Sequence, residues 1–108
     1  MNFKLELVPV PVTDIDRAKK FHVEQVGFRL DHDVQPTPTV RIVQLTPPGS
    51  GCSIVLSAGM AGLAMAPGTL RGLHLVVDGI AAARAALAGR GVAMGAVANM
   101  GGILFAPF

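Results

Sequence analysis

The chain has 108 residues, of which 51% are hydrophobic and 15% charged, with a formal net charge of +2. So apolar a composition excludes a disordered chain and indicates extensive burial. The small charge and the absence of Trp and Tyr argue against nucleic-acid binding, and no apolar run is long enough to span a membrane.

The first half of the chain predicts a strand, a helix and three further strands. Residues 3–12 alternate as a strand whose prolines favour an edge position. A helix is expected from about 14 to 26, with Thr13 as its N-cap and Gly27 closing it. Three strands are expected at 28–35, 40–46 and 52–57.

Period-two alternation assigns the side chains of the second strand to two faces. Leu30, His32 and Val34 are expected on one face, which can look into a ligand pocket. Asp31 and Asp33 are expected on the other, beside Arg29. That second face resembles an ordinary solvated strand surface.

Residues 58–69 are rich in Gly and Pro and are expected to form a linker with one helical turn. Met60 and Met65 lie in it, where flexible thioethers can adapt to an apolar ligand or fill gaps.

The single cysteine, Cys52, is expected to be a small buried residue, because no local motif supplies a base for a catalytic thiol. A reducing cytoplasm is the expected location.

The second half repeats the beginning of the first. A strand is expected at 70–77, and a helix of about ten residues capped by Asp78 and closed near Gly89 to Gly91. Two strands follow, at 92–98 and 103–108, around a turn at 99–102. The same offset separates Ile15 from Ile80 and Ala18 from Ala83, so the chain is expected to hold two copies of one module.

The motifs and their order resemble the glyoxalase / bleomycin-resistance / extradiol-dioxygenase (vicinal oxygen chelate) superfamily. The resemblance lies in the following segments: residues 12–21 (VTDIDRAKKF), 25–28 (QVGF), 41–45 (RIVQL), 47–50 (PPGS), 72–78 (GLHLVVD) and 89–92 (GRGV). It implies an α+β fold of paired βαβββ modules whose mixed sheets curl into a cup, and a homodimer. The second module shows one strand fewer than the first.

The whole of residues 1–108 is therefore expected to be one glyoxalase/bleomycin-resistance-like domain. Its first module spans about 1–57, its linker about 58–69 and its second module about 70–108. Whether the cup forms within one chain or between two swapped chains stays open at this point.

Enzymes of this superfamily hold a divalent metal on His and Glu side chains, which polarises the substrate as a Lewis acid. The resemblance implies ligand positions at or near Leu7, in the fourth strand and near Gly72, none of which offers a His or a carboxylate. His74 lies two residues beyond Gly72 and shares its face. One ligand is too few for such a site, so no complete metal site is expected.

Two functions therefore remain open. The first is a small-molecule-binding protein with an apolar cup, in which the polar contacts would be His74, His32, Gln44, Ser53 and Ser57. The alternative is a lyase, isomerase or dioxygenase that depends on a divalent metal such as zinc, nickel, manganese or iron, with His74 as a ligand. A degenerate member with only a structural role is a third, weaker interpretation. The expected partners are a small-molecule ligand and a second copy of the chain.

Overall fold

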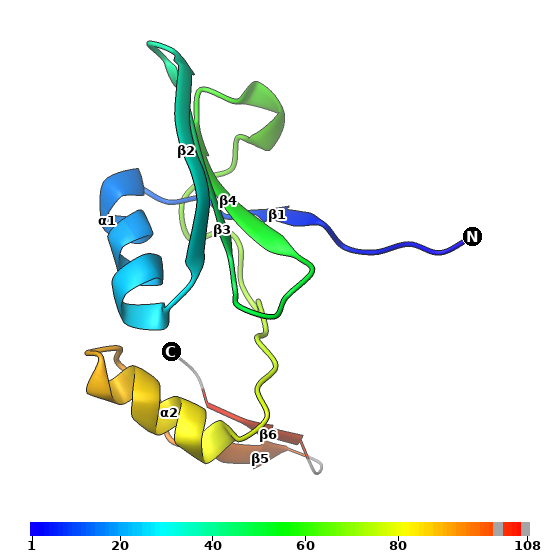
Figure 1. Cartoon of the computed structure of the whole chain (residues 1–108), viewed down its shortest axis with the longest axis vertical. Helices are drawn as coiled ribbons and strands as arrows, with labels where there is room; N and C mark the ends of the chain where they lie inside the picture. The colour runs from blue at the N-terminus through cyan, green and yellow to red at the C-terminus, as the bar shows by residue number, and fades with distance from the viewer. Residues whose placement is uncertain (101–102, 107–108) are drawn as a thin grey trace. The chain divides into compact units, whose positions relative to one another are not determined.

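A computed structural model describes residues 1–100 and 103–106 of the chain. The chain forms two compact units, Met1–Gly72 and Leu73–Phe108, which are described separately (Figure 1). Within the described residues, no helix is long and apolar enough to cross a membrane.

The first unit has the βαβββ order that the sequence predicts. Its elements are β1 (Leu7–Pro9), α1 (Ile15–Lys20) continued by η1 (Phe21–Val26), β2 (Arg29–Thr37), β3 (Val40–Thr46), β4 (Ser53–Ala58) and the 3-10 turn η2 (Ala61–Leu63). The strands form one mixed, curled sheet in the order β1-β4-β3-β2, with β1 parallel to β4 and the other pairs antiparallel. This confirms the α+β class.

The helix and its N-cap each begin one residue later than predicted. Asp14, not Thr13, is the N-cap, and its carboxylate accepts a hydrogen bond from the Arg17 N–H at 3.1 Å. The helix widens to π geometry over η1 and ends at Gly27, whose φ of 93° is accessible to glycine. The Gly27 N–H donates to the His22 carbonyl at 2.9 Å.

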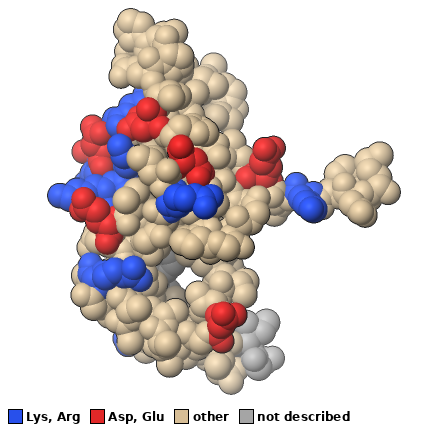
Figure 2. All heavy atoms as spheres, viewed as in Figure 1, with Lys and Arg blue, Asp and Glu red and all other residues tan. Residues whose placement is uncertain are grey.

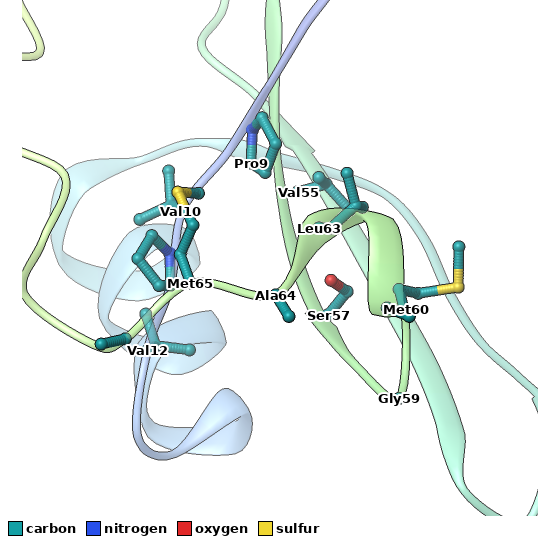
Figure 3. Close-up of a pocket in the computed structure, with 13 residues that line it drawn as sticks. Pro9, Val10, Val12, Val55, Ser57, Gly59, Met60, Leu63, Ala64 and Met65 are labelled. Atoms are coloured by element: carbon teal, nitrogen blue, oxygen red, sulfur yellow. The ribbon is translucent and has the colours of Figure 1, made fainter.

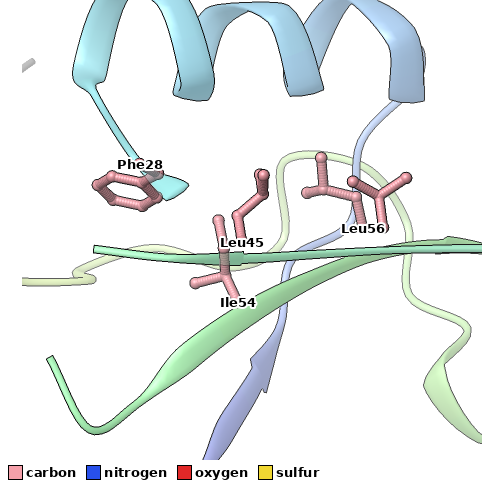
Figure 4. Packing of buried hydrophobic residues seen from close by; sticks show 5 residues of the cluster. Phe28, Leu45, Ile54 and Leu56 are labelled. Atoms are coloured by element: carbon pink, nitrogen blue, oxygen red, sulfur yellow. The ribbon is translucent and has the colours of Figure 1, made fainter. Parts of the chain in front are cut away.

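The core lies between the helix and one face of the sheet (Figure 4). Val43, Leu45 and Leu56 are fully buried there, and Phe28 and Ile54 complete the cluster. These residues alternate along β3 and β4, so each strand presents every second side chain to α1. Burial of each such side chain contributes about 2 kcal/mol to folding. We call the opposite face of the sheet the distal face.

An irregularity in β2 changes the predicted faces of that strand. The pairing with β3 shifts by one residue between Leu30 and His32, so Leu30 lies opposite Leu45 while His32 lies opposite Gln44. Asp33 consequently faces the helix, and Asp31 reaches Gln44 on the distal face. The prediction that Asp31 and Asp33 share one solvated face is wrong.

Asp33 is the centre of an ion-pair cluster that joins α1 to the sheet. Its carboxylate lies 2.8 Å from the Lys19 ammonium and 2.8 Å from the Arg41 guanidinium, which also pairs with Asp16 at 2.8 Å. Hydrogen bonds from Arg41 and Lys19 hold the pKa of Asp33 well below its ordinary value of 3.8. Figure 2 shows positive and negative side chains intermixed over this part of the unit.

The first strand is shorter than the sequence predicts. Only Leu7–Pro9 pair as β1, and Phe3 and Leu5 are 86% and 78% exposed on a segment that extends away from the sheet (Figure 1). The sequence alternates from residue 3, but a strand also needs a partner. Because β4 begins only at Ser53, which pairs with Leu7, the residues before Leu7 have no strand to pair with.

The second unit contains α2 (Ile80–Gly89), β5 (Ala98–Met100) and β6 (Ile103–Phe105). Ile80 and Leu87 are half-buried on α2, as its pattern predicts, but the N-cap is Gly79 and not Asp78. The Arg84 side chain donates to the Gly95 carbonyl at 2.7 Å.

Three predicted strands of the second unit differ from the structure. Residues 70–77 contain no strand, and the strand predicted over 92–98 begins only at Ala98. The strand predicted over 103–108 ends at Phe105, since Ala106 is not in a strand and 107–108 lie outside the described residues. Part of the predicted turn at 99–102 also lies outside them, and Asn99 and Met100 belong to β5.

Candidate functional site: a cavity on the distal face

A cavity of about 620 Å³ lies beside β4 on the distal face (Figure 3). Two segments line it besides the strand: residues 9–12, which follow from β1, and residues 59–66, which contain η2. Leu63 lies over Val55, and Met65 lies beside Val10 and Val12. The linker predicted at 58–69, with its single helical turn, thus provides one wall of the cavity.

Strand register places the cavity floor in a row that crosses the whole sheet. Pro9 pairs with Val55, Val55 with Gln44, and Gln44 with His32. Directly paired residues point to the same face with Cβ atoms about 5 Å apart. The row therefore runs from the apolar cavity floor at Val55 to the polar side chains of Gln44 on β3 and His32 on β2.

Four of the five predicted contact residues share this distal face. Ser57 is half-buried and lines the cavity, Gln44 is half-buried, and His32 is exposed. Ser53 is only 9% exposed and belongs to the polar cluster described next. His74 lies in the second unit, where its side chain is exposed.

A polar cluster centred on Asp31 lies on the distal face and is not predicted by the sequence pattern. One carboxylate oxygen accepts hydrogen bonds from the Thr46 hydroxyl and from Gln44 Nε2, the latter at 3.3 Å. The other accepts from Arg29 Nε at 3.2 Å. Thr46 Oγ1 lies 2.6 Å from Ser53 Oγ. The hydrogen bond from Thr46, helped by those from Gln44 and Arg29, lowers the pKa of Asp31 against the opposing effect of burial.

The register shift in β2 brings His32 to the distal face beside this cluster. Strict alternation from Arg29, which lies opposite Thr46, would place Asp31 on the distal face but His32 on the helix face. Because one extra residue is accommodated between Leu30 and His32, Asp31 and His32 both lie beside Gln44. The sequence carried no turn residue or glycine at this point that would have signalled the shift.

His22 and Cys52 do not line this cavity. His22 is packed at the boundary of the helix, with its ring 5.4 Å from Phe28 and Nδ1 2.7 Å from the Ala18 carbonyl oxygen. Cys52 is a free thiol, although it is half-buried where full burial was expected.

The donors at the implied metal positions do not fit a divalent ion. Leu7 lies beside Ser53 in the register of β1 and β4, which places an aliphatic group and a hydroxyl where His and Glu would be needed. Across the part of the chain that the structure describes, no three His, Cys, Asp or Glu side chains are grouped so that they could hold a metal ion.

The architecture of the first unit defines a class of protein: a βαβββ module with a cavity on the sheet face that is not covered by the helix. Several solved structures are similar to this chain over most of its length. TnmS3, an antibiotic binding protein from Streptomyces sp. CB03234, matches with 40% identity over 93% of this chain and 80% of its own, at a TM-score of 0.77. A glyoxalase/bleomycin resistance protein from the same organism is 42% identical over 91% of this chain and 83% of its own (TM-score 0.74).

A third structure, a member of the glyoxalase/bleomycin resistance protein/dioxygenase superfamily from Sphaerobacter thermophilus DSM 20745, is 27% identical over 93% of this chain and 82% of its own (TM-score 0.75). No protein-family model and no curated protein matches the chain. The chain belongs to the glyoxalase/bleomycin resistance protein/dioxygenase superfamily. The predicted resemblance is thereby confirmed.

Proposed function

We propose that this protein binds a small, largely apolar molecule of the antibiotic kind in the cavity on its distal face, without transforming it. The observation that carries the proposal is the cavity of about 620 Å³, a volume suited to a drug-sized ligand. Valine, leucine, alanine, proline and methionine side chains make up most of its lining. Similarity to an antibiotic binding protein at 40% identity supports the same function.

Polar groups at the edge of the cavity would orient the ligand. Ser57 lines the cavity, and Gln44, His32 and Ser53 follow on the same face of the sheet. His74 stays among the proposed contacts on the family resemblance alone. Met60 and Met65 would let the 59–66 wall adjust, because a thioether side chain adopts many shapes at little cost.

A thermal-shift screen of apolar natural products, followed by calorimetry, tests the proposal. A ligand present at about one hundred times its Kd stabilises the folded state by about 2.7 kcal/mol, which would raise Tm by several degrees. Ala64→Trp places a large ring in the cavity wall and should weaken binding by about tenfold or more.

Ala85→Trp is the matched control, since Ala85 is exposed on α2 and the same ring there meets solvent. It should leave affinity unchanged. The proposal would be abandoned if no compound shifted Tm, or if both tryptophan variants bound as tightly as the original chain.

The oligomeric state, the location and the partners of the protein are proposals as well. We propose a homodimer in a cytoplasmic location, with a small-molecule ligand and no nucleic-acid or membrane partner. The metal-dependent alternative has less support, because Leu7 and the β4 residues are not metal ligands. It predicts that the purified protein retains about one zinc, nickel, manganese or iron ion per chain, and that His74→Ala releases it.

A further inference from the structure

The polar cluster around Asp31 lies next to the cavity floor. Gln44, which donates to Asp31, is the cross-strand neighbour of Val55, and Ser53 lies two residues from Val55 on β4. The Asp31 side chain is 18% exposed and Gln44 is half-buried. A ligand that covers Val55 and extends along the row toward His32 therefore meets this cluster.

The protons of the cluster can be assigned from its chemistry. An ionised carboxylate only accepts hydrogen bonds, so Gln44 must turn its amide nitrogen toward Asp31, which leaves the carbonyl oxygen Oε1 on the other arm. Thr46 has one hydroxyl proton, and it is donated to Asp31. Ser53 must then donate its own proton to the Thr46 oxygen.

One N–H of Gln44 and the hydroxyl protons of Thr46 and Ser53 are thus directed inward. Most of the groups left to meet a ligand are oxygen lone pairs: those of Gln44 Oε1, of Ser53 Oγ and of the Asp31 carboxylate itself. The depressed pKa of Asp31 keeps the carboxylate charged at neutral pH, which holds the arrangement in place. The second N–H of Gln44 Nε2 and the guanidinium of Arg29, whose side chain is 69% exposed, carry the remaining donors of the cluster.

We propose that Asp31, through Gln44, Thr46 and Ser53, makes this edge of the cavity an acceptor-rich surface that selects ligands with a hydroxyl, phenol or ammonium donor. The inference rests on the proposed function and adds the class of ligand. A ligand that offers only acceptors, such as an ether or a ketone, would leave these oxygens unpaired and buried, which disfavours its binding.

A matched pair of fused-ring probes tests the selection. 2-Naphthol and 2-methoxynaphthalene have the same ring system and differ in one hydroxyl donor. The original chain should bind 2-naphthol about tenfold more tightly, as expected for a hydrogen bond to a charged group. Asp31→Asn removes the charge and releases the neighbouring donors, so the preference should fall to about twofold, as measured by fluorescence titration.

Asp33→Asn is the matched control. It removes a carboxylate two residues away on the same strand, but one that faces α1 and not the cavity. It should keep the tenfold preference. Gln44→Met is a second test that leaves Asp31 in place and removes the Oε1 acceptor; it should reduce the preference by at least half. Melting curves of all variants establish that each is folded before titration.

The outcomes separate the inference from the proposed function. If both probes bind the original chain equally, or if Asp31→Asn and Gln44→Met keep the full preference, binding stands and the donor selection is wrong. If neither probe binds the original chain, the apolar binding function is contradicted and the inference fails with it.

Discussion

Asp31 and Asp33 are two residues apart on β2 and have opposite surroundings. Asp31 accepts hydrogen bonds from Gln44 and Thr46 on the distal face, whereas Asp33 pairs with Lys19 and Arg41 on the helix face. One shift in strand register separates them. Because of this one-residue shift, Asp33 stabilises the contact between α1 and the sheet, whereas Asp31 lies where it is proposed to recognise the ligand.

Asp33 should make stability depend on pH. Its pKa is lower in the folded protein than the ordinary 3.8, so its ion pairs contribute fully to stability above 3.8, and the contribution is lost progressively as the pH falls from 3.8 through the lower pKa of the folded state. Asp33→Asn should cost about 1 kcal/mol at pH 7 and less at pH 2. Urea unfolding of the original chain and the variant at both pH values measures this.

Asp16→Asn provides the comparison for that experiment. Asp16 also pairs with Arg41, but its side chain is 80% exposed, so solvent screens the interaction. Its removal should change stability by less than about 0.5 kcal/mol at either pH. A loss from Asp33→Asn that was equal at both pH values would contradict an electrostatic role for Asp33.

The residues that the sequence could identify are those that obey regular alternation. Gln44 and Ser57 lie on the face expected for a pocket because β3 and β4 alternate without interruption. His32 also lies there, but its neighbour Leu30 does not, because the shift intervenes. Asp31 could not be identified as part of the site, since a register shift depends on the partner strand and not on the residues of β2 alone.

At the scale of elements, long-range partners decide where the strands begin and end. β3 was predicted to the residue and β4 within one, because both have partners on two sides. Residues 3–6 and 70–77 have strand-like sequences but lack strand pairing. The helix boundaries were predicted well from capping signals, although the capping residues lie one position later than expected.

The wall of the cavity depends on Gly59, which follows β4. Its φ is +76°, and a Cβ atom there would come 2.1 Å from the Thr39 carbonyl oxygen. Gly59→Ala should therefore lower the free energy of unfolding by about 3 kcal/mol and disturb the 59–66 segment. Chemical denaturation measures the loss, and limited proteolysis should show earlier cleavage in this segment.

Gly68→Ala is the control for Gly59. Gly68 has nearly the same φ, +80°, but nothing lies within 4 Å of the Cβ position. It should cost only about 1 kcal/mol, the penalty for the left-handed conformation. Equal losses in the two variants would mean that contact with Thr39 does not restrict Gly59.

At the scale of the whole molecule, exposed apolar side chains support the proposed homodimer. Phe3, Leu5 and Val76 are 86%, 78% and 97% exposed, an arrangement that favours burial against a partner. Light scattering at micromolar concentration should give twice the chain mass of 11.1 kDa. Leu5→Glu should weaken the dimer by about tenfold if this segment lies in the interface.

Lys4→Glu is the matched control for the dimer, because Lys4 is an exposed charged residue next to Leu5 and not an apolar one. It introduces the same side chain one position away and should leave the mass unchanged. A monomeric mass for the original chain would refute the proposed dimer directly.

The parallel pairing of β1 with β4 affects the order in which the strands of the sheet should assemble and open. The hairpins of β2, β3 and β4 connect near neighbours, but Leu7 pairs with Ser53, nearly half the chain away. Closing so long a loop is entropically costly, so β1 should dock last in folding and detach first in local opening. Pro9 of β1 and residues 10–12, which follow it directly, belong to the cavity wall. Detachment of β1 would therefore loosen one wall of the cavity, and a bound ligand that contacts this wall should slow that opening.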